Sequence, residues 1–405
     1  MQTHISEILK DTSEGQEADT ILRTCVHCGF CNATCPTYQL LGDELDGPRG
    51  RIYLMKQMFE GQPVGRHTQT HLDRCLTCRN CETTCPSGVE YGRLLDLSRP
   101  MVEARVQRPV SERAMRWLLR QVLPYRARFA FLLALGRTVR PALPQALRSK
   151  VPRTQERLPW PQPRHPRRML VLEGCVQPSI APRTNAAAAR VLDRLGISLR
   201  PAGGGCCGAM SYHLSYIEEA REAARRNIDA WYPALEAGAE ALVMTASGCG
   251  AHIKEYGHIL RDDPDYAQRA AEVAARTRDL SEVISKEDLG ALPRPQQRRI
   301  AFQSPCTLQH GQQLAGRTEG VLRDMGLELV PVADKHLCCG SAGTYSILQP
   351  ELAQRLRDDK LAKLQANEPE VVATANIGCQ VHLQSNAGVP VRHWIELLAE
   401  PIAER

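Results

Sequence analysis

The feature that most constrains this chain is a pair of cysteine runs, each of which ends in a Cys-Pro dipeptide. In both runs three cysteines follow one another at intervals of three residues, and a fourth comes four residues later. The runs are Cys25, Cys28, Cys31 and Cys35, and then Cys75, Cys78, Cys81 and Cys85. This spacing is typical of loops that bind [4Fe–4S] clusters. Structural zinc usually takes two C-x-x-C pairs and fits the spacing less well.

We expect the two clusters to exchange their fourth ligands, because in two-cluster ferredoxins the last cysteine of each run ligates the other cluster. The expected ligand sets are Cys25, Cys28, Cys31 and Cys85 for the first cluster, and Cys75, Cys78, Cys81 and Cys35 for the second. The proline after each fourth cysteine is expected to hold it at the start of a helix. Two clusters in one small domain form a path for electrons, and this predicts no catalytic residues in it.

The cysteine content and the N-terminus together bear on the compartment. Sixteen cysteines would suggest disulfides in a small secreted protein. Residues 1–20, however, are polar and lack the apolar core of a signal peptide. We therefore expect metal-bound thiolates in the reducing cytoplasm. No apolar run is long enough for a membrane span, so the chain is expected to be cytoplasmic, or peripheral on the inner face of the cytoplasmic membrane.

A length of 405 residues predicts several domains. We expect a two-cluster domain at 1–100, a basic helical segment with a Pro-rich linker at 101–167, and α/β domains at 168–295 and 296–405. The stretch between the cysteine runs contains a turn, LDGPRGR, and a helix, YLMKQMF. This long helical insert resembles the all-α ferredoxin module of succinate dehydrogenase and fumarate reductase iron–sulfur subunits. The fold class expected is α+β multidomain.

The C-terminal part repeats itself at an interval of about 131 residues. The strings DRLGISLRPAGGGCCGAMSY and RDMGLELVPVADKHLCCGSAGTY correspond, as do EALVMTASGCG and EVVATANIGCQ, each of which predicts a strand followed by a glycine–cysteine turn. A repeat of this length indicates a duplicated domain. The repeated cysteines are Cys175, Cys206, Cys207 and Cys249, and then Cys306, Cys338, Cys339 and Cys379.

Cysteines that follow strands would converge at the strand ends of an α/β domain. Three interpretations stay open for each set of four: an iron–sulfur cluster, another metal such as zinc, or buried free thiols kept for packing. The pattern resembles the cysteine-rich (CCG) domain of the heterodisulfide reductase B subunit. In that pattern the last element is C-x-x-C, whereas here His252 and His382 stand where the fifth cysteine would be.

These two histidines are candidates for residues that donate a hydrogen bond to a ligand thiolate. The alternatives are that they ligate the metal directly or that they are ordinary histidines of the core. His310, four residues after Cys306, is a weaker candidate because the first repeat has no counterpart to it.

The order of two cluster runs and two CCG domains resembles the iron–sulfur subunits of glycolate oxidase, anaerobic glycerol-3-phosphate dehydrogenase and lactate utilisation systems. Within this family SPCTLQHG, TANIGCQVHL and VPVRHWIELL are most similar to the glycolate oxidase branch. The resemblance implies flavoprotein partner subunits on which FAD oxidises glycolate to glyoxylate, and a relay of electrons through this chain toward a quinone-type acceptor. It implies two [4Fe–4S] clusters and leaves further clusters in the CCG domains open.

The basic segment has no Asp or Glu from Arg113 to Gln155. It predicts two helices separated near Pro124, whose arginines and apolar side chains alternate. They are expected to pack on the ferredoxin module or on a partner subunit, with an anionic lipid surface as the alternative. The net charge of +6 resides in this segment, so nucleic-acid binding is not predicted.

Three other functions compete with the glycolate relay. The nearest is the equivalent subunit of a lactate or glycerol-3-phosphate dehydrogenase. A second is a catalytic CCG protein that cleaves a disulfide, which the missing fifth cysteines argue against. A third is a redox-sensing or scaffolding protein, which duplicated electron-carrying modules do not favour.

Overall fold

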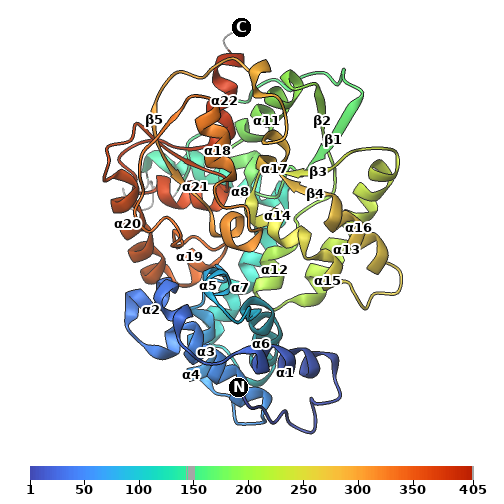
Figure 1. Ribbon diagram of the computed structural model, residues 1–405, viewed down its shortest axis with the longest axis vertical. Coiled ribbons are helices and arrows are strands. Elements are labelled where there is room, and N and C mark those ends of the chain that lie inside the picture. Colours follow the sequence, from blue (N-terminus) through green and yellow to red (C-terminus); the bar gives the residue numbers. More distant parts are fainter. Residues whose placement is uncertain (143, 145–150, 404–405) are drawn as a thin grey trace.

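The computed structural model describes residues 1–142, 144 and 151–403. Residues 143 and 145–150 of the predicted basic segment therefore lie outside the described residues. Figure 1 shows a helical N-terminal module at one end of the molecule and two α/β domains side by side above it. The two termini lie at opposite ends.

The N-terminal module is helical, as predicted, and its described residues form no β-strand. It consists of α1 (Ser13–Thr24), η1 (Phe30–Thr34), α2 (Pro36–Leu41), η2 (Glu44–Asp46), α3 (Pro48–Phe59), α4 (Arg66–Asp73), α5 (Asn80–Thr84) and α6 (Tyr91–Arg105). The predicted helix YLMKQMF lies in α3. The predicted turn LDGPRGR is wrong in its second half, because Pro48 occupies the first turn of α3, where a missing N–H costs nothing.

The predicted helices on either side of Pro124 are α7 (Val110–Val122) and α8 (Arg126–Val139), followed by η3 (Arg140–Ala142). Helix α7 buries Arg116 and Leu119, whereas no residue of α8 is buried. Helix α8 lies against the short helix at Gln177–Ile180 of the first α/β domain, and Arg126 pairs with Glu173 of that domain at 3.0 Å. Packing of these helices on a partner subunit stays a prediction. Among the described residues, no helix combines the length and the apolarity that a membrane crossing requires.

The two α/β domains have the same topology. The first contains β1 (Arg167–Val171), α10 (Gln177–Ile180), α11 (Arg183–Arg194), β2 (Ile197–Pro201), α12 (Ala209–His213), α13 (Ile217–Glu236), β3 (Leu242–Met244), α14 (Ser247–Lys254), α15 (Tyr256–Ile259), α16 (Ala267–Arg276), β4 (Thr277–Asp279), α17 (Leu280–Ile284) and η4 (Leu289–Ala291). The second contains β5 (Arg299–Gln303), η5 (Thr307–Gly311), α18 (Arg317–Asp324), β6 (Glu328–Leu329), α19 (Tyr345–Leu348), α20 (Pro350–Gln365), β7 (Val371–Thr374), α21 (Ile377–Gln384), β8 (Val391–His393) and α22 (Trp394–Ala403).

Each sheet is parallel, in the order β2-β1-β3-β4 and β6-β5-β7-β8. The strands β3 and β7 are apolar throughout or nearly so and are fully buried, as expected for parallel strands covered by helices on both faces. In the first sheet the chain passes from β1 outward to β2 on one side and from β3 outward to β4 on the other. In the second sheet it passes from β5 to β6 and from β7 to β8 in the same way. The carboxyl ends of these central strands form a topological switch point, where α/β proteins place their binding sites.

The two domains share one hydrophobic core. Residues of β1, α11 and β3 belong to the same buried cluster as residues of β5, β7 and α22, and α22 packs against α11. Polar contacts also cross the interface: among them, Thr184 donates to Glu396 at 2.7 Å, and His393 Nε2 donates to the carbonyl of Thr245 at 2.8 Å. The duplicated domains are therefore packed as one body.

The N-terminal module contacts both α/β domains through its second cysteine run and the helix that follows. On the first domain, Arg79 and Arg93 both pair with Glu255, at 3.0 and 2.9 Å. On the second domain, Asn80 donates to the carbonyl of His336 at 3.3 Å, and Tyr345 donates from its hydroxyl to a carbonyl of the module. The second run thus lies at the junction of all three domains.

The shared core makes a prediction about stability. Replacing fully buried Trp394 with alanine removes a large side chain that packs between the two domains. We expect a loss of about 3–5 kcal/mol in the free energy of unfolding, with amide protection reduced in β1 and β3 of the first domain as well as in the second. Hydrogen exchange followed by mass spectrometry measures both effects.

The matched control is Leu364→Ala, which opens a cavity in a buried cluster that belongs to the second domain alone. It should reduce protection first in the second sheet. If Trp394→Ala left β1 as protected as in the wild type, the two domains would not share a cooperative core.

Candidate metal centres

Four cysteines that are distant in the sequence of the module surround one cavity. Cys25, Cys28 and Cys31 come from the first run, and Cys85 comes from the end of the second. We call these four the first tetrad. Cys25 is buried, Cys31 and Cys85 are half-buried, and Cys28 is exposed. The first tetrad therefore lies at the surface of the module.

A second cavity gathers the remaining four cysteines of the module. It is lined by Cys75, Cys78 and Cys81 of the second run and by Cys35, the last cysteine of the first. We call these the second tetrad. Cys81 also reaches the rim of the first cavity, but its nearest thiols are Cys78, Cys75 and Cys35. The second tetrad is more deeply buried than the first.

The helix placement predicted for the fourth cysteines holds for one of them. Cys35 precedes Pro36, which starts α2. Cys85 also precedes a proline, but residues 86–90 form a turn and a loop, and the next helix begins only at Tyr91. The prediction is therefore wrong for Cys85, because Pro86 is followed by Ser87 and Gly88, and Gly88 takes a positive φ of 68° that ends the turn.

Both cysteine runs use the same backbone geometry. The residue two after the first cysteine has a positive φ, at His27 (60°) and Thr77 (54°), and so has the residue one after the second cysteine, at Gly29 (87°) and Arg79 (59°). This conformation turns N–H groups toward sulfur: the Thr77 N–H donates to Cys75 Sγ at 3.4 Å. A positive φ destabilises a non-glycine residue by about 1 kcal/mol. The two loops therefore contain locally unfavourable backbone where it directs N–H donors at the thiols.

Burial makes Cys31 of the first tetrad and Cys78 and Cys81 of the second harder to ionise. Burial, reinforced by Cys25 and Cys85, raises the pKa of Cys31 to about 11, and burial also raises the pKa of Cys78 and Cys81 well above the ordinary value. Iron supplies the positive charge that converts crowded thiols into thiolate ligands, with release of their protons. Four convergent thiols around a cavity are the donor set that a [4Fe–4S] cluster takes, so the residues fit the group.

A buried arginine touches the second tetrad. Arg51 is 1% exposed, and its guanidinium lies 3.9 Å from Cys35 Sγ and 3.1 Å from the Thr37 hydroxyl. Its Nε donates to the carbonyl of His71 at 2.8 Å. A fixed positive charge beside a ligand sulfur stabilises the more negative, reduced state of a cluster. Sequence reasoning missed Arg51, because an arginine in a turn-like segment between the runs carries no mark of burial.

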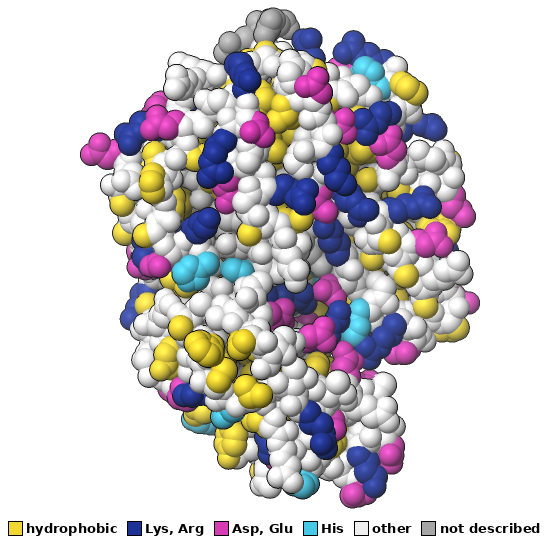
Figure 2. All heavy atoms as spheres, viewed as in Figure 1, with side chains coloured by type: hydrophobic (Ala, Val, Ile, Leu, Met, Phe, Trp, Pro, Cys, Tyr) yellow, Lys and Arg dark blue, Asp and Glu magenta, His cyan; other side chains and the backbone are white. Residues whose placement is uncertain are grey.

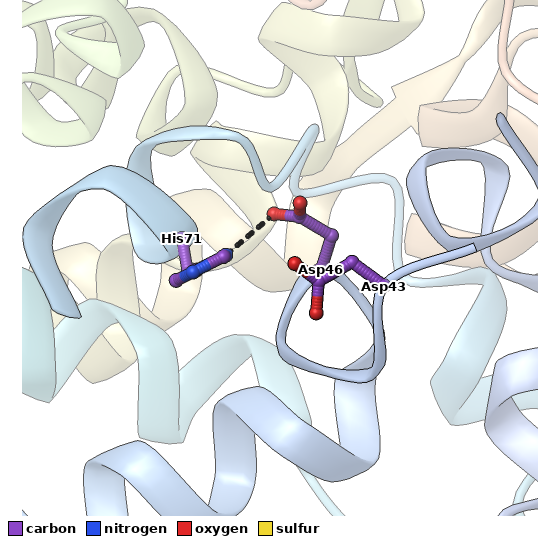
Figure 3. Close-up of side chains that lie close together, drawn as sticks. All are labelled: Asp43, Asp46 and His71. Carbon is purple, nitrogen blue, oxygen red and sulfur yellow. Dashed lines mark hydrogen bonds and ion pairs between the residues drawn. The ribbon is translucent and has the colours of Figure 1, made fainter. Parts of the chain in front are cut away.

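Asp46 orients this arginine. His71 donates to the Asp46 carboxylate at 2.9 Å, as Figure 3 shows. Arg74 donates to the same carboxylate at 2.8 Å, and the Arg51 guanidinium lies 3.5 Å from it. Asp43 lies beside them in Figure 3, where it caps η2 by accepting from the Leu45 N–H. The fully buried carboxylate of Asp46 is thus neutralised by cationic and N–H groups, which leaves no role for a metal cation there.

Tyr91 is a second residue that the sequence did not single out. It is buried, lines the cavities of both tetrads, and lies 3.6 Å from Cys75 Sγ through its hydroxyl. Tyr91 thus lies in the wall that the two cavities share. No motif surrounds it in the sequence, so only the fold reveals it.

In the first α/β domain the four repeated cysteines meet at the carboxyl edge of the sheet. Cys175 follows β1, Cys206 and Cys207 follow β2, and Cys249 lies in the first turn of α14 after β3. We call these the first CCG site. The thiols contact one another in sequence order, and hydrogen bonds from Cys175 and Cys207 lower the pKa of Cys206 well below its ordinary value. The convergence predicted from the sequence is what the structure shows.

The second CCG site repeats this arrangement with Cys306, Cys338, Cys339 and Cys379. Cys306 Sγ lies 3.9 Å from Cys338 Sγ, and the side-chain amide of Asn376 donates to Cys379 Sγ at 3.6 Å. Like Cys249, Cys379 lies in the first turn of a helix, α21, and not in the turn that the sequence predicted. In both domains this helix begins directly after an extended N-cap residue, Ala246 or Asn376.

A glycine fixes each adjacent cysteine pair. Gly208 and Gly340 have φ of 90° and 86°, and a Cβ would lie 3.1 Å from the carbonyl oxygen of Ala220 or 2.6 Å from that of Ala353. The Gly340 N–H donates to Cys338 Sγ at 3.4 Å. Only glycine gives both the left-handed backbone and this close approach.

The three candidate histidines have different environments. His382 Nε2 donates to the carbonyl of Ala353 at 3.1 Å, and His310 bonds Thr83 at 2.8 Å and the carbonyl of His336 at 3.0 Å, which joins the second domain to the module. His252 is buried, and its Nε2 has no hydrogen-bond partner. Burial lowers the pKa of His252 to about 4, so its ring is neutral.

The second tetrad adjoins the second CCG site. Cys78, Cys306 and Cys338 pack in one apolar cluster with Leu76 and Tyr345. The contacts to the first α/β domain are instead charged, through Glu255. The apolar contact places ligand candidates of two different domains next to each other.

Family comparisons agree with this division of the chain. Residues 21–89 match the family described as 4Fe-4S dicluster domain. Residues 169–254 and 300–384 each match the family described as cysteine-rich domain, CCG.

Relatives also match over the whole chain. The chain is 56% identical to the glycolate oxidase iron-sulfur subunit of Escherichia coli (strain K12), over 99% of both chains. It is 30% identical to the probable glycolate oxidase iron-sulfur subunit of Bacillus subtilis (strain 168), over 95% of this chain and 93% of that protein. The lactate utilization protein A of Geobacillus thermodenitrificans (strain NG80-2) is 32% identical but matches only 52% of this chain, with 90% of its own length covered.

The position of Arg51 makes a prediction about electron affinity. Arg51→Gln removes a buried positive charge next to Cys35, so we expect the midpoint potential of the centre at the second tetrad to fall by on the order of 100 mV, with its iron retained. EPR-monitored redox titration of the anaerobic protein measures the shift.

Arg74→Gln is the matched control. Arg74 also pairs with Asp46, but its side chain is 33% exposed, and its guanidinium donates to the Asp46 carboxylate and not to a thiol. We expect a shift several-fold smaller than for Arg51→Gln. Equal shifts in the two variants would mean that loss of Asp46 pairing, and not charge beside sulfur, sets the potential.

Proposed function

The chain belongs to the family of glycolate oxidase iron–sulfur subunits, and from this membership we propose that it relays electrons from a flavoprotein partner that oxidises glycolate to glyoxylate. It is an iron–sulfur subunit of an oxidoreductase. The chemistry at the CH–OH group of the substrate belongs, in this proposal, to FAD on the partner subunit. The electrons pass to a quinone-type acceptor.

The first tetrad would hold one [4Fe–4S] cluster and the second tetrad another. Such clusters, when bound, accept and release single electrons without making or breaking bonds in a substrate. The protein supplies the ligands, the N–H donors of the two loops, and the positive charge of Arg51 beside Cys35.

The observation that carries the proposal is the graded exposure of the cysteine sites. The first tetrad reaches the surface at Cys28, the second tetrad is more deeply buried, and the second CCG site adjoins Cys78 through Cys306 and Cys338. The order leads from the surface of the module into the α/β domains. A relay requires such a succession of neighbouring sites, whereas a scaffold does not.

The surface around the first tetrad suits a docking partner. Val26 and Phe30, in the loop that carries Cys28, are 67% and 64% exposed. Figure 2 shows hydrophobic side chains gathered on the N-terminal module in this view. An apolar patch around an exposed ligand loop is where we propose that the flavoprotein subunit binds and delivers electrons.

A disulfide-cleaving CCG protein is the rival from another class. The pattern of that family uses a fifth cysteine, and this chain has His252 and His382 at those positions. We therefore propose that the CCG sites are electron-carrying and not substrate-binding.

We further propose that the protein is cytoplasmic and attaches to the inner face of the membrane through α7 and α8. Helix α8 has no buried residue, and exposed apolar side chains recur along both helices. The exposed apolar residues in these helices and between them are Val110, Met115, Trp117, Leu118, Tyr125, Phe131, Leu132, Leu135 and Val139. Arg113, Arg126 and Arg128 are exposed among them, and no acidic residue lies between Arg113 and Gln155. This charge complements anionic headgroups.

The relay predicts which substrate reduces the clusters. In the complex isolated anaerobically from its native cells through a tag on this chain, glycolate should produce the EPR signal of reduced [4Fe–4S] centres within seconds. D-Lactate and glycerol 3-phosphate should not. If one of these two reduced the centres and glycolate did not, the relay would stand but its upstream enzyme would be a different dehydrogenase.

A variant separates docking from electron transfer. Phe30→Ser should slow the reduction by glycolate while leaving reduction by dithionite unchanged, because the ligands remain in place. Ile347→Ser, at a residue 45% exposed on α19 of the second α/β domain, is the control. A wild-type rate of glycolate reduction in Phe30→Ser would rule out the proposed docking patch.

The attachment to membranes predicts lipid selectivity. The complex should sediment with phosphatidylglycerol vesicles at low salt and not with phosphatidylcholine vesicles. The double variant Arg126→Gln/Arg128→Gln should weaken this binding by about tenfold or more. Vesicle co-sedimentation across a salt series measures it.

Ile347→Ser tests whether any exposed apolar residue matters, since Ile347 is 45% exposed but lies on α19. It should bind vesicles as the wild type does, whereas Phe131→Ser should not. If the wild type ignored anionic vesicles, α8 would be assigned to a protein partner.

A further inference from the structure

The two CCG sites differ in what surrounds their histidines. His252 and His382 stand at equivalent places, each three residues after the last cysteine of its site and on the same short helix as that cysteine, α14 or α21. Residues three apart on a helix lie on the same face. Each ring is therefore carried on the face of its helix that presents Cys249 or Cys379.

The ring of His382 is hydrogen-bonded to the backbone. Its Nε2 lies 3.1 Å from the carbonyl oxygen of Ala353 in α20. A carbonyl only accepts, so Nε2 carries the proton and the lone pair of this ring is on Nδ1. The charged side chains that act on the ring are Arg357 and Asp358, and no cysteine of the second CCG site is among them. The ring is half-buried and is fixed in this orientation.

The ring of His252 has no such partner, although the equivalent carbonyl exists. Ala220 in α13 corresponds to Ala353, since its carbonyl oxygen is the backbone atom nearest a Cβ on Gly208, as that of Ala353 is for Gly340. His252 Nε2 is buried and unpartnered all the same. A buried nitrogen without a partner destabilises a fold, so such an atom calls for a specific explanation, of which a bound ion is one.

The surroundings of His252 hold the ring by packing and not by hydrogen bonds. Tyr212 and Tyr256 lie 5.3 and 5.8 Å away between ring centroids. Tyr256 is itself fixed, because its hydroxyl donates to the carbonyl of Cys207 at 2.7 Å. Among the thiols of the first CCG site, Cys206 is the one that interacts electrostatically with the imidazole. The free nitrogen thus belongs to a ring that is wedged beside the cysteines.

We propose that His252 is a direct ligand, through Nε2, of an iron–sulfur centre held by Cys175, Cys206, Cys207 and Cys249, and that the second CCG site has no histidine ligand. Thiolate and neutral imidazole are both donors that iron accepts, and imidazole in place of thiolate raises the potential of a cluster. The two CCG centres are then unlike each other, and the first has the higher potential. The inference rests on the proposal that the first CCG site holds a cluster.

Isotope labelling combined with pulsed EPR tests this ligation directly. The intact chain, purified anaerobically after growth with 15N-histidine and otherwise natural nitrogen, should show a strongly coupled 15N signal on one centre. His252→Ala should lose that signal, and His382→Ala, the matched control, should retain it. His252→Cys should also lose it while keeping the iron of the site and shifting its potential downward, which guards against a variant that fails only because it misfolds.

The outcomes separate the inference from the proposed function. A CCG centre that contains iron but shows no histidine coupling would overturn the ligation and leave the centre standing. Coupling that is lost in His382→Ala and kept in His252→Ala would also overturn it. A fully loaded chain with iron only at the two tetrads, or with zinc at the first CCG site, would overturn the proposed centre and the ligand together.

Discussion

Several thiols gathered in a protein interior are unfavourable in their charged forms, because thiolates repel one another and burial penalises each of them. This constraint recurs at both tetrads and at both CCG sites, and it raises the pKa of Cys31, Cys78 and Cys81. The chain answers it with N–H donors aimed at sulfur, with the buried guanidinium of Arg51, and, in our proposal, with iron. The left-handed residues of the cysteine loops and the two CCG glycines are needed because straight backbone cannot present those donors.

The two α/β domains each gather four cysteines in the same way, but the packing of the domains gives the two cysteine sites different neighbours. In each copy parallel strands deliver cysteines that are distant in sequence to one edge of the sheet. The shared core fixes both edges relative to the N-terminal module. The second site thereby meets the second tetrad through apolar contacts, whereas the first meets the module through the ion pairs of Glu255. Equivalent sequences acquire unequal surroundings, and the unequal partners of His252 and His382 are one result.

Much of the fold was predictable because its signals are local. The cysteine spacing predicted the pairing of each run with the last cysteine of the other, and the structure gathers the same thiols around two cavities, although ligation itself stays a proposal. The 131-residue repeat predicted two similar α/β domains. The errors were also local: Pro48 starts a helix where a turn was predicted, and Pro86 starts none, since the residues after each proline decide whether a helix continues from it.

The sequence alone determined the donor types, the number of sites, the duplication and the family, because cysteine spacing and repeated strings survive without knowledge of contacts. Only the tertiary structure decided that Arg51 and Tyr91 touch the second tetrad, that α8 has no fully buried residue, and that His252 lacks the partner that His382 has. The reason is physical. Burial, hydrogen-bond partners and nearby charge arise between segments that are far apart along the chain, and no local pattern records which of them will meet.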